Sequence, residues 1–493
     1  MQDNPFRPNI VSSQDSNIVR VSGLGHITAE FEWTCVVCKS ITSDWSARCG
    51  TCNATNSIRK EILDDEKVRH GATPITKVDT EEVNHIPTGI GELDRALGGG
   101  IVLGGVTLLT GDPGVGKSTL TVQMLASLSK TGRRTLYATA EEGKAQVAAR
   151  AKRLNAMSDK LYLLAETKLD VILETIDKVN PECLVLDSIQ TIRTSEGTPG
   201  SVNQLKEIAD RVVQRAKNKK ANGGIATFII GHITKDGGIA GPKALEHLVD
   251  TVLQFEGEKG QAFRTLHTSK NRNGKSPESG FFEMTANGME EVPNASEFFL
   301  AERNTDEPGS IIAAASEGER SILVEVQAIV GSIKPNGGRI TSNGVNEKRV
   351  SMIMAILERR NLDSKLQFGS RDIFLNIAGG ITITEPALDL PIAIAIMSSL
   401  TSKVVPPDTV AFGELGLTGE VRGVPRSSTR ITESRIMKFQ QIIVPRSTSI
   451  ESVETKRKIT DLWPVASISE VLDTTFSRTD VRKGTSERKR RRG

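Results

Sequence analysis

Residues 111–118 read Gly111-Asp112-Pro113-Gly114-Val115-Gly116-Lys117-Ser118 and match every fixed position of the phosphate-binding loop, G-x-x-x-x-G-K-[S/T]. The apolar run at 106–110 is typical of a buried strand, and residues 118–125 have the pattern of a helix. A fortuitous glycine-rich turn would not need these flanks, whereas a phosphate-binding loop joins a strand to a helix. The stretch therefore predicts a site for a nucleoside triphosphate.

The chemistry of this loop assigns roles to its residues. Glycines let backbone N–H groups turn toward phosphates at the positive end of a helix, and Lys117 neutralises the outer phosphates. The hydroxyl of Ser118 can bind Mg²⁺. We therefore expect ATP and Mg²⁺ as cofactors. The nucleotide would be bound by Gly111, Asp112, Pro113, Gly114, Val115, Gly116, Lys117, Ser118 and Thr119.

Further acids complete the candidate site. Asp187 ends the apolar run 183–186, so it lies at the carboxyl end of a predicted strand, where it can hold Mg²⁺ directly or through water. Glu141 and Glu142 follow the predicted strand 135–140, which brings a carboxylate to the same edge of the sheet. We prefer Glu141 as the catalytic base that activates water. The alternative is that both acids cap the following helix.

Composition bounds the class of protein. A chain of 493 residues divides into about three domains of ordinary size. It has no run of about 18 apolar residues and no apolar N-terminal core, so we expect no membrane span, no signal peptide and a cytoplasmic location. The formal net charge is +3, but residues 482–493 hold seven basic side chains and one acid, net +6, which leaves −3 for the rest. Contact with nucleic acid must therefore come from local loops or the basic tail.

Four of the five cysteines are spaced as two knuckles. They are Cys35, Cys38, Cys49 and Cys52, with two residues inside each knuckle and ten between the knuckles. Such a pattern can place four thiolates around one Zn²⁺ ion, and a segment of about 25 residues needs a metal to fold. A redox pair and free thiols are the alternatives. We expect Trp33 and Trp45 to pack over this small core.

Changes in pattern along the chain predict its domains. Apolar strands alternate with helical patterns in two long regions, which predicts an α/β fold with a mostly parallel sheet covered by helices. The expected parts are a flexible N-terminal extension (1–30), a zinc finger (31–57), a linker (58–80), an ATPase core (81–290), a second α/β domain (291–475) and a basic disordered tail (476–493).

Several motifs together resemble the bacterial RadA/Sms family of DNA-repair ATPases, over nearly the whole chain. They are the four cysteines, Pro87-Thr88-Gly89-Ile90-Gly91-Glu92-Leu93-Asp94, Lys270-Asn271-Arg272-Asn273-Gly274, and Phe412-Gly413-Glu414-Leu415-Gly416-Leu417-Thr418-Gly419-Glu420. The resemblance implies a zinc finger, a RecA-like ATPase core and a C-terminal domain shaped like the Lon protease domain, assembled as a hexameric ring. It also implies a helicase-like motor of recombinational repair that acts on single-stranded DNA and branched intermediates, with a recombinase of the RecA type as a partner. Lys270 and Arg272 would complete a neighbouring subunit's ATP site.

Two departures from the family pattern qualify what the resemblance implies. Asn273 stands where the family signature Lys-Asn-Arg-Phe-Gly has phenylalanine, which removes apolar packing beside Lys270 and Arg272. In the Lon-like domain, the stretch Glu385-Pro386-Ala387 falls where an active protease has its nucleophilic serine, and Ser428 falls where it has its lysine. Without the Ser–Lys dyad no activated nucleophile exists, so we expect no proteolysis.

Two glycine-rich stretches, 193–200 and 232–243, follow the predicted catalytic strands. In a RecA-like ring these positions face the central channel, so Arg193, Lys235 and Lys243 would meet DNA phosphates. The scarcity of aromatic residues argues against base stacking as the main grip. The alternative is that both stretches are ordinary surface loops. His232 is either a sensor of the γ-phosphate or a structural histidine.

The sequence thus favours an ATP-hydrolysing, Mg²⁺-dependent DNA motor. A nucleotide-switched regulator that binds protein partners without moving DNA would have the same core. Stimulation of ATP hydrolysis by DNA would separate the two functions.

Overall fold

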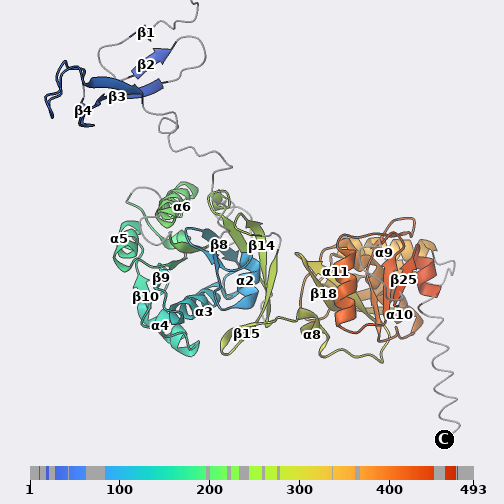
Figure 1. Cartoon of the computed structure of the whole chain (residues 1–493). Helices are drawn as coiled ribbons and strands as arrows, with labels where there is room; N and C mark the ends of the chain where they lie inside the picture. Colours follow the sequence, from blue (N-terminus) through green and yellow to red (C-terminus); the bar gives the residue numbers. More distant parts are fainter. Residues whose placement is uncertain are drawn as a thin grey trace, which may run out of the picture. The chain divides into compact units, whose positions relative to one another are not determined.

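The computed structural model describes residues 10–11, 18–21, 28–42, 44–62, 84–195, 200–218, 224–232, 244–257, 261–274, 278–335, 337–360, 367–448, 461–473 and 475. The chain divides into two compact units, Met1–Glu82 and Val83–Gly493. The second unit holds two large sheets, each in its own α/β domain (Figure 1).

The ATPase core is built on a nine-stranded sheet. Strands β10, β9, β11, β12, β8 and β13 run parallel in that order, and β14, β15 and β16 continue the sheet antiparallel. The bounds are β8 (Val106–Gly111), β9 (Thr135–Thr139), β10 (Leu161–Ala165), β11 (Cys183–Asp187), β12 (Ala226–Ile230), β13 (Thr251–Glu256), β14 (Phe263–Asn271), β15 (Ser279–Thr285) and β16 (Gly288–Glu291). A small ribbon of β6 (His85–Ile86) and β7 (Ile101–Val102) lies outside this sheet.

Alternation of side chains along the strands explains the three layers of this domain. Tyr137 and Val185 belong to a core shared with helices on one face, whereas the adjacent Leu136 and Leu184 belong to a core on the other face. Because both faces are buried, the central strands are continuous apolar runs. Helices α2 (Gly91–Leu97), α3 (Lys117–Lys130) and α4 (Lys144–Arg153) cover the first face, and α5 (Leu169–Val179) and α6 (Val202–Lys217) cover the second. The short helix η2 (Ile189–Thr191) follows β11.

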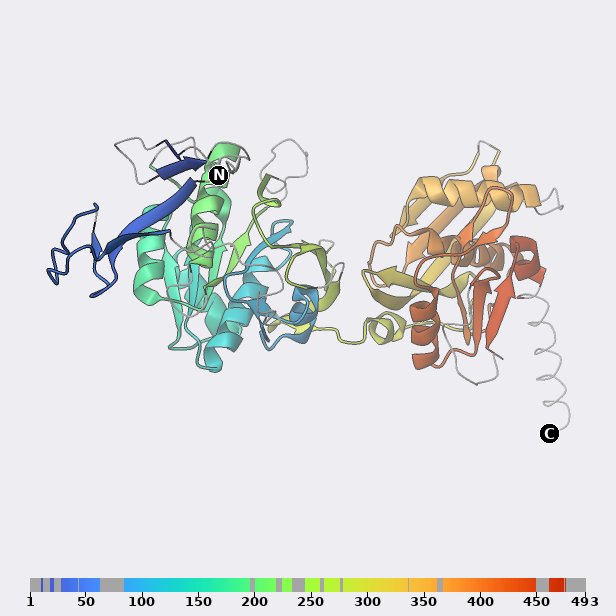
Figure 2. The ribbon, with the colours of Figure 1, turned by 45° about the horizontal axis from the view of Figure 1, so that its top comes forward.

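The C-terminal domain has a seven-stranded mixed sheet in the order β19 (Ile340–Asn343), β20 (Arg371–Ile377), β18 (Arg320–Ile333), β17 (Ser310–Glu317), β21 (Thr409–Ala411), β24 (Gln441–Pro445) and β25 (Leu462–Val465). Helices α9 (Glu347–Arg360) and α10 (Asp389–Thr401) pack on one face, and α11 (Ser427–Ile436) packs on the other, as Figure 2 shows for α9 and α11. The remaining elements are α8 (Ala295–Leu300), η3 (Phe368–Ser370), η4 (Pro386–Leu388), β22 (Glu414–Leu415) and β23 (Val421–Arg422).

The first unit is a small antiparallel sheet. Its strands are β1 (Ile10–Val11), β2 (Ile18–Val21), β3 (Thr28–Cys35), β4 (Ile41–Thr42) and β5 (Ile58–Ile62). Strands β1 and β2 lie in the stretch 1–30, where the sequence indicated no regular structure, and β5 lies in the stretch expected to be a linker. The basic tail, 476–493, lies outside the described residues.

The predicted fold class is confirmed, with a phosphate-loop α/β core and a second α/β domain. The predicted strand that ends at Asp187 has the observed bounds of β11, and the predicted strand 135–140 exceeds β9 by one residue. Across the described part of the chain, none of the helices is both long and apolar enough to span a membrane.

An ion pair between the buried Arg430 and the partly exposed Glu385 lies in the stretch where the resemblance puts a protease nucleophile. Nη1 and Nη2 of Arg430 donate to the two carboxylate oxygens of Glu385, at 2.9 and 2.5 Å. The backbone N–H of Ser316 also donates to Glu385, at 2.6 Å, and Arg430 donates to the carbonyl of Ala314. The Arg430 side chain is 1% exposed. Glu385 therefore joins η4 to α11 and β17.

Replacing Arg430 by alanine should destabilise the C-terminal domain, because α11 would lose its buried hydrogen bonds to Glu385 and to the carbonyl of Ala314. Glu385 is 22% exposed and keeps the N–H of Ser316 as a partner, so we expect a loss of about 1.5–3 kcal/mol in unfolding free energy, the range for a hydrogen bond to a charged group. Denaturant unfolding of Arg430→Ala measures this loss. The matched control is Arg426→Ala, which removes a partly exposed pair with Glu319 and should cost less than about 1 kcal/mol. Equal losses in the two variants would contradict the structural role of Arg430.

Candidate nucleotide and metal sites

The loop between β8 and α3 has the conformation that phosphate binding needs. Gly114 and Gly116 have φ angles of 85° and 116°, in the left-handed region that glycine adopts without strain. A Cβ on Gly116 would also lie 1.9 Å from the Cε of Met289, which would have to move. Helix α3 begins at Lys117, directly after the loop, so its first N–H groups have no partner within the helix. This arrangement suits an anion.

Lys117 lies folded over the same loop. Its Nζ donates to the carbonyl oxygens of Gly111, at 2.7 Å, and of Asp112, at 3.0 Å. Lys117 is 4% exposed, and burial lowers its pKa, while the charges of Asp187 and Glu141 act in the opposite direction. The ammonium group is thus held at the loop by neutral carbonyl oxygens, which a phosphate oxygen can replace.

Ser118 and Asp187 meet although they come from distant parts of the chain. The hydroxyl of Ser118 donates to Oδ2 of Asp187 at 2.6 Å, and the hydroxyl of Tyr137 donates to the same oxygen. Asp187 is the last residue of β11 and is 5% exposed. A hydroxyl and a carboxylate are oxygen ligands of the kind that Mg²⁺ prefers. These two residues therefore fit a magnesium site.

The two neighbouring acids after β9 have different surroundings. Glu142 forms an ion pair with Arg150 of α4. Oε1 of Glu141 instead accepts a hydrogen bond from Ser188 and lies 3.1 Å from Nε2 of His232. Hydrogen bonding with His232 and then with Ser188 lowers the pKa of Glu141, so its carboxylate is ionised at neutral pH. These contacts support the choice of Glu141 over Glu142 as a base.

Several polar residues of this site were not predicted from the sequence. Tyr137 looks like a core residue, Arg150 looks like a surface residue of a charged helix, and Ser188 has no motif of its own. Around the site, four buried side-chain atoms have no hydrogen-bond partner in the described part of the chain: Oε2 of Glu142, Nη1 of Arg150, Oε1 of Gln190 and Nδ1 of His232. Unsatisfied buried polar groups are uncommon and mark places where a ligand or water supplies the partner. Their gathering here supports a ligand site.

Lys270 and Arg272 lie at the amino-terminal end of the parallel strands, whereas the phosphate-binding loop of their own protomer follows the carboxyl end of β8. Strand β14 runs antiparallel to β13, and the N–H of Arg272 donates to the carbonyl of Asp250, which precedes β13. That end of the sheet is level with Val106, whereas the loop begins at Gly111, about 16 Å further along the strand. Nζ of Lys270 donates to the carbonyls of Glu246 and Val249, whereas the Arg272 side chain is 59% exposed.

Asn273 lines a small cavity whose other walls are largely apolar, including Leu97, Ile101 and Phe228. The turn around it is held by Asn271 instead. Oδ1 of Asn271 accepts hydrogen bonds from the N–H of Asn273 and from Thr251, and its Nδ2 donates to the carbonyl of Leu97. The turn thus has polar supports that do not depend on an aromatic side chain at position 273.

The candidate DNA-contacting residues are only partly described. Arg193 is exposed, and its backbone pairs with Thr167 and Leu169, which places it beyond the carboxyl end of β11. Lys235 and Lys243 lie outside the described residues.

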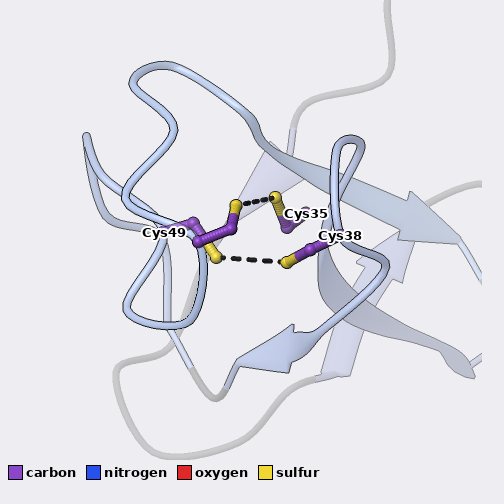
Figure 3. A group of neighbouring side chains, drawn as sticks. Cys35, Cys38 and Cys49 are labelled. Atoms are coloured by element: carbon purple, nitrogen blue, oxygen red, sulfur yellow. Dashed lines mark hydrogen bonds between the residues drawn. The ribbon is translucent and has the colours of Figure 1, made fainter.

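The four cysteines of the first unit form one cluster. Their sulfur atoms all lie within 4.8 Å of one another, with 3.7 Å between Cys35 and Cys52 and 3.6 Å between Cys38 and Cys49. Figure 3 shows Cys35, Cys38 and Cys49 directed toward a common centre. A tetrahedral zinc ion with Zn–S bonds of about 2.3 Å requires sulfur atoms about 3.8 Å apart. Hydrogen bonding with Ser40 lowers the pKa of the Cys49 thiol to about 5, which favours the thiolate. The cluster therefore fits a zinc ion.

The prediction for the two tryptophans is half right. Trp33 packs against the cysteine cluster, but Trp45 is 57% exposed. The loop that carries Trp45 lies between the knuckles, and the core of three buried residues is too small to cover a second indole.

Comparison with known family models finds one match that covers much of the ATPase core and another that covers part of the C-terminal domain. A family model described as "AAA domain" matches residues 72–238, and one described as "Subunit ChlI of Mg-chelatase" matches residues 337–448. Among solved structures, the chain is similar to one whose title describes an ATPase domain, at 13% identity and a TM-score of 0.37, over 44% of this chain and 94% of that one.

Curated relatives match most of the chain. The DNA repair protein RadA of Halalkalibacterium halodurans is 42% identical over 427 residues, which cover 84% of this chain and 92% of that protein. RadA of Bacillus subtilis is 40% identical, over 90% of this chain and 98% of that protein. RadA of Aquifex aeolicus is 38% identical with the same two coverages. The chain therefore belongs to the RadA family of DNA repair proteins.

Proposed function

We propose that this chain is a DNA-dependent ATPase of recombinational repair, which assembles as a hexameric ring and acts as a helicase-like motor on single-stranded DNA and branched intermediates. The observation that carries the proposal is the position of Lys270 and Arg272, about 16 Å along the sheet from the loop of their own protomer. In a ring, this edge would face the ATP site of the neighbouring copy. Hydrolysis would then depend on contact between subunits.

The residues of the loop edge can perform the hydrolysis. Glu141, ionised at neutral pH, accepts the proton of the attacking water, and Ser188 and His232 orient its carboxylate. Lys117 moves from the carbonyls of Gly111 and Asp112 to the phosphate oxygens. Ser118 and Asp187 would hold Mg²⁺, which neutralises charge on the phosphates when bound.

The neighbouring subunit would supply the remaining positive charge. Arg272 is the better candidate of the two cations, because its side chain is exposed and lies 4.0 Å from Asp250, a distance that gives little restraint. Lys270 is bound to the carbonyls of Glu246 and Val249, so it would position the turn that carries Arg272. An arginine supplied in trans stabilises charge on the γ-phosphate as it develops.

DNA would contact the loops at the carboxyl edge of the sheet. The described part of this surface includes Arg193, and Lys235 and Lys243 belong to the stretch that follows β12 in the sequence. Because these stretches follow β11 and β12 in the sequence, DNA bound to them would act on Ser188 and His232 and so on Glu141. We also propose a recombinase of the RecA type as a protein partner, from the family's role in recombinational repair.

Single-stranded DNA should raise the rate of ATP hydrolysis by the purified full-length protein. The measurement is phosphate release with and without single-stranded DNA, and Lys117→Ala, which removes the cation from the phosphate site, should be inactive in both conditions. A rate that DNA leaves unchanged would contradict the motor and favour a nucleotide-switched regulator that binds protein partners. Turnover by Lys117→Ala would contradict the ATP site itself.

Mixing two inactive variants should restore activity if Arg272 acts in trans. Glu141→Gln lacks the base but keeps its arginine, and Arg272→Ala keeps its base but lacks the arginine, so mixed rings contain some complete sites. We expect ATPase activity to reappear after subunit exchange. Lys217→Ala is the matched control, because Lys217 pairs with the same acid, Asp250, at 3.0 Å, and this variant alone should remain active. Absence of recovery despite exchange would contradict the role of Arg272 in trans.

We propose that the cysteine cluster binds one structural zinc ion per chain. Metal analysis of freshly reduced protein should find one zinc, and Cys35→Ser should lose the metal and unfold the first unit, because binding supplies much of the folding energy of so small a core. The same variant should still bind ATP. Cys183→Ser is the control: Cys183 is buried in β11, away from the cluster, and its replacement should leave the zinc content unchanged. Zinc-free wild-type protein would contradict the proposal.

A further inference from the structure

We propose that Tyr137 is a positioning residue for the magnesium ligand Asp187: its hydroxyl fixes one carboxylate oxygen, so that the other is directed toward the ion. The inference rests on the nucleotide and magnesium site proposed above. It assigns a role to a residue of the sheet's interior.

The register of the sheet brings the two residues together. Strands β9 and β11 are parallel neighbours, with Tyr137 opposite Val185 and Thr139 opposite Asp187. Tyr137 and Asp187 are therefore two positions apart along adjacent strands and point to the same face, about 7 Å apart along the strand direction. That separation matches the length of a tyrosine side chain lying along the sheet toward its carboxyl edge.

Two hydroxyl groups then act on one carboxylate oxygen. Oδ2 of Asp187 accepts a hydrogen bond from Ser118, at 2.6 Å, and one from Tyr137. Neither bond uses Oδ1. Because the two donors come from different elements, α3 and β9, they fix the rotation of the carboxylate group. Without Tyr137, the rotation of the carboxylate would be fixed by Ser118 alone, and Ser118 must itself bind the ion.

Tyr137 is buried in the core of the domain and is 2% exposed. The ring packs in an apolar core with Val185 and Leu109, which phenylalanine would fill equally well. The hydroxyl is thus dispensable for packing, and its hydrogen bond goes to Asp187.

If the Tyr137 hydroxyl had only a structural role, a different result would be expected. If the hydroxyl only satisfies a buried polar group, its removal lowers stability and leaves metal binding unchanged. If it positions Asp187, its removal weakens metal binding even where the fold is intact. The two readings are separated by measuring the metal itself.

The test is a titration of Mn²⁺ into the full-length protein with the slowly hydrolysed analogue ATPγS, followed by electron paramagnetic resonance of the free ion. Tyr137→Phe should bind Mn²⁺ about tenfold more weakly than wild type, the scale of a hydrogen bond to a charged group. The control is Thr135→Val on the same strand, which removes a buried hydroxyl that donates to the carbonyl of Leu125. It should leave Mn²⁺ binding unchanged. In an Asp187→Asn background, Tyr137→Phe should have no further effect, because the role acts through Asp187.

The outcomes separate the inference from the function on which it rests. Wild-type affinity for Mn²⁺ in Tyr137→Phe, with or without lower thermal stability, overturns the positioning role alone. Failure of the wild-type protein to bind Mn²⁺ with ATPγS overturns the proposed site as a whole.

A second measurement keeps the test valid if Tyr137→Phe fails to fold. The chain has two tyrosines, Tyr137 and Tyr162. In a Tyr162→Phe protein labelled with 3-fluorotyrosine, a single ¹⁹F signal reports Tyr137, and it should shift when Mg²⁺ and ATPγS bind together but not with ATPγS alone. A signal that does not respond to Mg²⁺ contradicts the positioning role.

Discussion

The hydrogen bond from Ser118 to Asp187 joins two segments that are 69 residues apart in the chain, and the rest of the nucleotide site is arranged around it. It forms because β8, β9, β11 and β12 are parallel, so their carboxyl ends lie at one edge of the sheet. Helix α3 leaves β8 and packs across β9, β10 and β11, which brings its first turn to the end of β11. The same edge receives Glu141 after β9, Ser188 after β11 and His232 after β12. Parallel topology alone therefore collects these groups from four separate strands.

The antiparallel extension of the sheet has the opposite consequence. A parallel β14 would have brought its carboxyl end to the phosphate-binding loop, but β14 is antiparallel, so Lys270 and Arg272 lie at the far edge. No side-chain movement spans about 16 Å, since an extended arginine reaches about half that distance. In the proposed ring, these two cations would serve the ATP site of another copy of the chain. The reversal of strand direction thus separates them from the phosphate-binding loop of their own protomer.

Much of the fold could be predicted because its signals are local. Strands buried on both faces are continuous apolar runs, so the bounds of β11 follow from the sequence. Which side chains meet depends on the register of the strands and on the order in which the crossover connections place them, and neither can be seen in the sequence. Glu141 and Glu142 are adjacent and alike in sequence, and they are distinguished by their partners, which are Arg150 for Glu142 and Ser188 and His232 for Glu141. Tyr137 was not predicted as a site residue for the same reason. An aromatic residue in an apolar strand indicates core packing until its neighbour on the adjacent strand is known. Trp45 was predicted wrongly because its burial depends on the number of residues available to cover it, and the first unit has few.

The C-terminal domain depends on an ion pair whose two partners differ in burial. Arg430 is buried and donates to Glu385 and to the carbonyl of Ala314, whereas the Glu385 side chain is 22% exposed. Changing Glu385 alone would leave a buried guanidinium without its counter-charge, at a cost of several kcal/mol. Changing Arg430 alone would leave Glu385 with the N–H of Ser316 and solvent as its partners. The two single changes are therefore unequal, and Glu385 matters most as the counter-charge of the buried Arg430.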